Sequence, residues 1–167
     1  EKNGFIMKDK KTNEYRTAKA LDLIRLLSLS RPFNSLRTVN YYSQDVFEKK
    51  LSVINDSKLG YAFSVFAGSE LFRTYVKTDQ VHAYVLEKDL KNWEKFLLSK
   101  GFLKAEKTQA NLFLIPASNA ALVKNAVKVK GFRIAQMPLL LSDLLSFGGL
   151  GEEQGSFLLE EWLNNRI

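Results

Sequence analysis

The chain contains one histidine, His82, and no cysteine. A Ser–His–Asp or Cys–His arrangement places its histidine beside a nucleophile and an orienting acid, and the residues next to His82 indicate neither. The position of His82 inside a predicted strand favours a structural or surface histidine. One histidine without cysteine also argues against a zinc site, because protein-bound zinc usually has several His or Cys ligands.

A second set of polar residues approaches the signature of a nucleotidyltransferase. Such enzymes place Gly-Ser at the start of a helix and two carboxylates, one residue apart, on the next strand, where they hold two metal ions. Gly68 and Ser69 are followed by Asp79, but Val81 occupies the position of the second acid. We therefore predict no nucleotidyl transfer, no tightly bound divalent metal, no catalytic residues and no cofactor. A catalytically inactive relative of this fold remains an alternative.

The lysines near the N-terminus suggest contact with a polyanion. Residues 1–50 hold 11 Lys and Arg against 6 Asp and Glu, whereas residues 51–167 hold 14 against 12. Residues 5–7 and 15–17 have the composition of two short strands, and the charged segment between them suits a hairpin turn. If this hairpin contacts DNA, the residues expected along the phosphate backbone are Lys8, Lys10, Lys11 and Arg16. The alternative is a solvated basic surface without a partner.

The first residues, Glu-Lys-Asn-Gly, have the pattern of a helix end with Gly4 just beyond it. Followed by a hairpin, this pattern resembles the last part of a winged helix-turn-helix domain, in which the hairpin is the wing. The resemblance implies that residues 1–17 are the C-terminal remnant of a DNA-binding domain whose other helices precede Glu1. A free-standing hairpin is the alternative.

The rest of the chain, residues 18–167, is predicted to form one domain. Apolar residues recur at helical spacing from 18 to 29, and Pro32 closes this predicted linker helix. Strands are predicted at 37–43, from 61, at 81–86, at 111–115 ended by Pro116, and at 126–129 paired with 132–135. Helices are predicted at 44–55, from about 67, at 88–100, at 138–147 and at 152–165, the last two separated by the glycine-rich residues 148–151. Because strands and helices mix without a strict alternation, we predict an α+β fold, a mixed-sheet α/β domain preceded by a wing-like hairpin and linker helix.

The overall composition suits a folded domain. Hydrophobic residues make up 46% of the chain and charged residues 26%, which is sufficient for a core and argues against disorder. The longest apolar runs, such as residues 137–141, are too short to span a bilayer, and no signal peptide is visible. The absence of cysteine suits a reducing compartment. These features favour a cytoplasmic protein without a membrane partner.

A diffuse set of segments carries a family resemblance across about residues 18–167. The segments are 61–63 (Tyr-Ala-Phe), Ala67 with Gly68, 81–85, 110–116, 137–145 (Met-Pro-Leu-Leu-Leu-Ser-Asp-Leu-Leu) and 149–154. Together they resemble the effector domain of AbiEi-type antitoxins from type IV toxin–antitoxin systems. Members of that family similarly end in a helix with a proline start and an Asp-Leu pair, a glycine turn and an acidic final helix.

The resemblance implies a DNA-binding transcriptional regulator that represses its own operon through an N-terminal winged helix. It implies double-stranded operator DNA as the partner, and a nucleotidyltransferase-like toxin encoded nearby that need not contact the antitoxin. Two alternatives stay open: a non-catalytic binding or dimerisation domain, with a homodimer as one form, and an enzyme of nucleotide or nucleic-acid chemistry.

Overall fold

The computed structural model describes residues 6–8, 15–17, 19–164 and 167, and its main feature is a mixed sheet of seven strands. Neighbouring strands follow the order β6-β3-β7-β5-β4-β9-β8. In this order the strands are Leu103–Lys104, Val39–Tyr42, Leu112–Ala117, Val81–Leu86, Tyr61–Ser64, Phe132–Ile134 and Val127–Val129. β5 pairs with β7, and β4 with β9, in parallel, whereas the other pairs are antiparallel. These features confirm the predicted α+β class with a mixed sheet.

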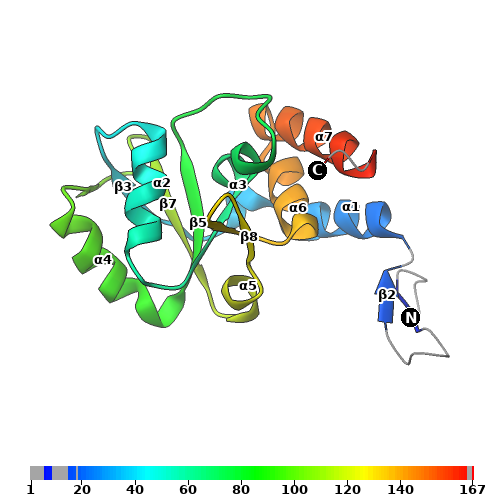
Figure 1. Cartoon of the computed structure of the whole chain (residues 1–167), viewed down its shortest axis with the longest axis horizontal. Helices are drawn as coiled ribbons and strands as arrows, with labels where there is room; N and C mark the ends of the chain where they lie inside the picture. Colours follow the sequence, from blue (N-terminus) through cyan, green and yellow to red (C-terminus); the bar gives the residue numbers. More distant parts are fainter. Residues whose placement is uncertain (1–5, 9–14, 18, 165–166) are drawn as a thin grey trace.

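Helices cover both faces of the sheet, as Figure 1 shows. On one side lie α1 (Ala20–Ser30), α3 (Val65–Phe72), α6 (Met137–Phe147) and α7 (Leu150–Leu163), and on the other lie α2 (Phe47–Asp56) and α4 (Leu90–Ser99). Shorter turns are η1 (Phe33–Ser35), η2 (Glu87–Asp89) and α5 (Ala121–Lys124). Because both faces are covered, β5 is buried from Val81 to Val85 without alternation. None of the helices in the described ranges is long and apolar enough to cross a membrane.

Side chains of β5 alternate between the two helical layers. His82 and Tyr84 face the layer that contains α6, since the Tyr84 hydroxyl bonds Asp143 of that helix. Val81, Ala83 and Val85 alternate with these two residues and face the opposite layer, which contains α2. The polar side chains of β5 therefore lie beneath α3 and α6, where the candidate site is found.

Pro116 does not end its strand, contrary to the prediction. β7 continues to Ala117, and Pro116 lies opposite Val85 of β5. β3 pairs with β7 only as far as Leu114, so β7 has one neighbouring strand at Pro116. A proline, which lacks a backbone N–H, is tolerated where one side of the strand needs no ladder hydrogen bond.

Two helix boundaries and two short elements also differ from the prediction. α7 begins at Leu150, so only Gly148 and Gly149, both with positive φ, separate it from α6. α3 begins at Val65, directly after β4, and not near residue 67. β6 and α5 were not predicted, because two and four residues are too few to show a periodic pattern.

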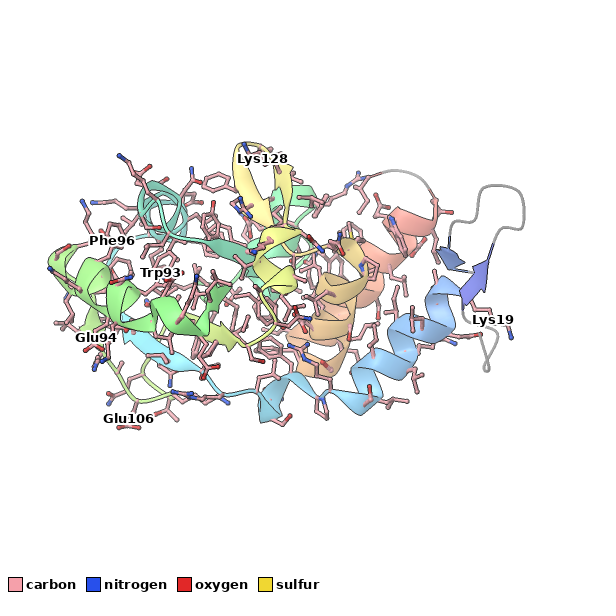
Figure 2. All side chains as sticks on the ribbon, turned by 90° about the horizontal axis from the view of Figure 1, so that it is seen from below. Lys19, Trp93, Glu94, Phe96, Glu106 and Lys128 are labelled. Atoms are coloured by element: carbon pink, nitrogen blue, oxygen red, sulfur yellow. The ribbon has the colours of Figure 1, made fainter. Side chains whose placement is uncertain are left out.

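A separate two-stranded sheet precedes α1. β1 (Ile6–Lys8) pairs antiparallel with β2 (Tyr15–Thr17), with Met7 opposite Arg16 and Lys8 opposite Tyr15. This pairing confirms the predicted hairpin strands, whereas Phe5 and residues 9–14 lie outside the described residues. Figures 1 and 2 place the two strands at the end of α1 that is far from the sheet.

Candidate functional site

The four basic residues predicted to contact DNA all belong to the hairpin segment. Lys8 lies in β1 and Arg16 in β2, whereas Lys10 and Lys11 lie outside the described residues. Lys19 follows the hairpin at the start of α1, where its side chain is exposed (Figure 2). The paired strands therefore hold two of the four predicted positions.

Gly68 and Ser69 lie in the middle of α3 and not at its start. A Cβ atom on Gly68 would lie 2.8 Å from Cδ1 of Leu140 and 3.1 Å from the carbonyl oxygen of Phe63. Glycine at this position thus lets α3 approach α6 and the end of β4. The Ser69 hydroxyl donates to the Phe66 carbonyl oxygen at 3.2 Å, within the helix. Helix packing therefore accounts for both residues.

Asp79 lies in the loop before β5 and is held by two neighbouring side chains. Lys50 of α2, whose side chain is fully buried, donates to the Asp79 carboxylate and, at 2.7 Å, to its carbonyl oxygen. Asn111 donates through Nδ2 to the second carboxylate oxygen at 2.8 Å. Over the part of the chain that the structure describes, no group of three or more His, Asp or Glu side chains is placed to hold a metal ion. Asp79 therefore joins α2 to the start of β7.

Replacing the two partners of this ion pair should have unequal effects. Asp79→Ala leaves the buried Lys50 ammonium without its counter-charge and should cost about 2–3 kcal/mol of the free energy of unfolding. Lys50→Met removes the buried charge, and water can solvate the Asp79 side chain, which is 59% exposed. This variant should stay within about 1 kcal/mol of the wild type. Urea denaturation of both variants measures the difference, and a larger loss for Lys50→Met would contradict this interpretation.

A buried polar cluster lies between β4, β5 and α6, and we call Arg31, Ser64, Tyr84 and Asp143 the Asp143 cluster. The Asp143 carboxylate is fully buried and accepts hydrogen bonds from Arg31 Nη1, the Ser64 hydroxyl and the Tyr84 hydroxyl, each at 2.7 Å. Arg31 Nη2 also donates to the Tyr84 hydroxyl at 2.5 Å. Arg31 follows the last residue of α1. The cluster therefore fastens the end of α1 to the sheet and to α6.

The environment of the Asp143 cluster shifts the pKa of three groups. Burial raises the pKa of the Asp143 carboxyl, against the opposing effect of Arg31 and the two hydroxyl donors. Burial also raises the pKa of the Tyr84 hydroxyl, which stays protonated and can donate. Burial acts to lower the pKa of Arg31, but Tyr84 and Asp143 outweigh it, and the net pKa is raised. The guanidinium and the phenol therefore both keep the protons that they donate.

The turn that positions Ser64 is strained. Val65, the next residue, has a φ of 49°, in the left-handed region that β-branched residues rarely adopt. Its side chain is fully buried, so surrounding packing holds this conformation. The turn joins β4 directly to α3 and leaves Ser64 within hydrogen-bonding distance of Asp143. Backbone strain of this kind is concentrated at sites that need a fixed geometry.

The structure brings a serine, a histidine and an aspartate into one region, although sequence analysis found no such group. Ser64 of β4 lies opposite His82 of β5, and Ser64 bonds Asp143. The serine hydroxyl donates to the carboxylate, whereas a catalytic triad has the histidine between serine and aspartate. One signal could have revealed the cluster: Asp143 is the only charged residue in α6, whose other residues are apolar or serine, and a charge on a buried helix needs a partner.

His82 lies in a cage of aromatic rings. Its ring stacks on Phe113 with a centroid distance of 4.6 Å and an interplanar angle of 9°, and Phe33 and Phe147 meet it edge-on at 5.4 and 5.5 Å. These four residues line a cavity of about 120 Å³, which we call the His82 cavity. Its remaining lining residues are Asn34, Thr38, Gln80 and Lys107. His82 is 3% exposed, and burial, with a smaller effect of Lys107, lowers its pKa to about 3.

Known proteins give no independent assignment for the Asp143 cluster or the His82 cavity. No family model, curated protein or solved structure matches this chain.

Proposed function

We propose that this chain is part of a cytoplasmic, antitoxin-like transcriptional regulator that binds double-stranded DNA and represses its own operon. The observation that carries the proposal is the β1–β2 hairpin, in which Met7 pairs with Arg16 and Lys8 with Tyr15. The hairpin belongs to the most basic part of the chain and leads almost directly into α1. In a winged helix, a basic hairpin of this kind contacts the phosphate backbone.

In this proposal the hairpin adds affinity, and sequence specificity comes from a groove-inserted helix outside residues 1–167. Lys8, Lys10, Lys11 and Arg16 would neutralise phosphates without contacting bases. A helix in the major groove would supply the base contacts, as in other helix-turn-helix proteins. Residues 1–167 by themselves should therefore bind DNA weakly and without preference for sequence.

The Asp143 cluster supports the same proposal because it fixes the position of α1, the helix that follows the hairpin. Because Arg31 bonds Asp143 and Tyr84, the end of α1 is held against α6 and β5. The other end of α1 leads to the hairpin, so the position of the hairpin depends on how α1 is held. The AbiEi resemblance adds a toxin of nucleotidyltransferase type that is encoded nearby and need not contact this chain.

The double variant Lys10→Ala/Lys11→Ala tests the wing. Each phosphate contact contributes about 0.9 to the slope of log affinity against log salt concentration, so the loss of two should reduce the slope by about 2. Affinity for the operon's own promoter and for random duplex should fall by the same factor. Fluorescence anisotropy with the full-length protein at four salt concentrations measures both quantities.

The matched control is Lys91→Ala/Lys95→Ala, which removes the same charge from exposed positions on α4. Figure 1 places α4 at the opposite end of the molecule from the hairpin. The control should leave the slope and the affinity unchanged. Equal slopes for the wild type and the hairpin variant would overturn the wing assignment.

A further inference from the structure

We propose that the His82 cavity binds a small aromatic carboxylate, with the ring inside the aromatic cage and the carboxylate at Lys107. This inference does not depend on DNA binding. It depends on the size of the cavity, the nature of its walls, the charge at its mouth and an unpartnered nitrogen of His82.

The size of the His82 cavity suits one aromatic ring. Its volume is about 120 Å³. An apolar cavity of about 150 Å³ is known to accept benzene, so this smaller cavity holds at most one ring, part of which would lie in its open mouth. Since the cavity is partly open to solvent, a substituent on the ring can extend through its mouth.

The walls of the cavity are held together by contacts between two segments of the chain. Phe33 belongs to η1 and Phe147 to the end of α6, and their ring centroids are 5.4 Å apart. Two hydrogen bonds join these segments: the Phe33 N–H donates to Ser146 Oγ at 3.2 Å, and Asn34 Nδ2 donates to the Phe147 carbonyl oxygen at 3.0 Å. A largely apolar cavity with a few polar groups is typical of small-molecule sites.

Charge at the cavity favours an anion. Lys107 is the only charged residue of its lining, and its side chain is exposed. No ion pair of Lys107 occurs among the described residues. The other polar residues of the lining, Asn34, Thr38 and Gln80, are neutral. An aromatic carboxylate would therefore place its ring against rings and its charge next to an ammonium group.

His82 supplies an independent observation at the same place. Its Nδ1 atom is buried and has no hydrogen-bond partner among the described residues. Buried polar atoms are nearly always hydrogen-bonded, and those left without a partner in a folded protein call for an explanation. A residue that contributed only to packing would not need a polar ring here, because the surrounding side chains are phenylalanines.

Benzoate is the probe for this site, and the 167-residue chain is sufficient for the test. His82 is the only histidine, so its ring C–H resonances can be followed by NMR without assignment. Benzoate should shift these resonances with a Kd of about 1 mM or below, a typical affinity for a ligand of this size. Benzamide, which keeps the ring and lacks the charge, should bind about tenfold more weakly, and acetate should not bind.

Two variants and a control complete the experiment. Lys107→Gln should weaken benzoate binding about tenfold, to the level of benzamide, and leave benzamide unaffected. His82→Phe removes the unpartnered Nδ1 but keeps an aromatic ring in the cage, so calorimetry should show weaker binding of both ligands, with circular dichroism and a melting curve to establish that the variant is folded. Lys95→Gln, an equivalent charge change on exposed α4, should bind like the wild type. The proposal is overturned if 10 mM benzoate leaves the His82 resonances unchanged, or if Lys107→Gln binds benzoate as the wild type does.

Discussion

Asp143→Ala should lower the free energy of unfolding by about 3–5 kcal/mol, the cost of breaking a buried ion pair by removing one partner. Asp143 is fully buried and accepts three hydrogen bonds, so its loss leaves the Arg31 guanidinium and two hydroxyl groups without their acceptor. Domains of this size are stable by only about 5–15 kcal/mol, and the change is a large share of that. Urea denaturation followed by circular dichroism measures it.

A series of variants measures how much each hydrogen bond of the Asp143 cluster contributes to the free energy of unfolding. Tyr84→Phe and Ser64→Ala each remove one donor to the carboxylate and should cost about 1–2 kcal/mol. Asp22→Ala removes an exposed aspartate from α1 and should change stability by less than about 0.5 kcal/mol. A loss below about 1 kcal/mol for Asp143→Ala would show that the cluster does not fasten α1 to the sheet.

The stability of the wild-type protein should fall by about 2 kcal/mol between pH 7 and pH 5 through His82 alone. The pKa of His82 is lowered to about 3 in the folded protein, chiefly by burial, whereas an unfolded histidine has a pKa of about 6.5. Between these values the unfolded chain binds a proton that the folded chain does not, so acid favours unfolding. Each pH unit in this window costs about 1.4 kcal/mol.

His82→Phe isolates this effect from the titration of carboxylates. Phenylalanine suits the aromatic surroundings and cannot be protonated, so the variant should gain about 2 kcal/mol relative to the wild type when the pH falls from 7 to 5. Denaturation curves of both proteins at the two pH values give the difference. A wild-type His82 whose NMR signals titrate near pH 6.5 would contradict the burial that the structure shows.

Sequence patterns predicted most regular elements because their periodicity is local. The strand predicted at 81–86 matches β5, although β5 is buried on both faces, and residues 126–129 and 132–135 do pair, with Val129 opposite Phe132. Lys130 and Gly131, both with positive φ, form the two-residue turn between them. Figure 2 shows Lys128 on this projecting hairpin.

The candidate site could not be predicted in the same way, because its residues come from distant segments. Arg31 and Asp143 are 112 residues apart, and Ser64 and Asp143 are 79 apart. Local propensity does not indicate which distant charges meet. The order of the strands could not be predicted for the same reason. β3 lies beside β7, and β6 beside β3, through pairings that no local pattern encodes. The His82 cavity likewise depends on η1 and the end of α6 meeting over β5.

The proposed DNA-binding function is tested most directly by comparing two duplexes, one from the operon's own promoter and one of random sequence. The product of the complete gene should bind the promoter at least about 10³-fold more tightly than the random duplex at physiological salt. Residues 1–167 alone should bind both weakly and equally, since phosphate contacts carry no sequence preference. No preference by the complete product, or a strong preference by residues 1–167, would contradict the proposal.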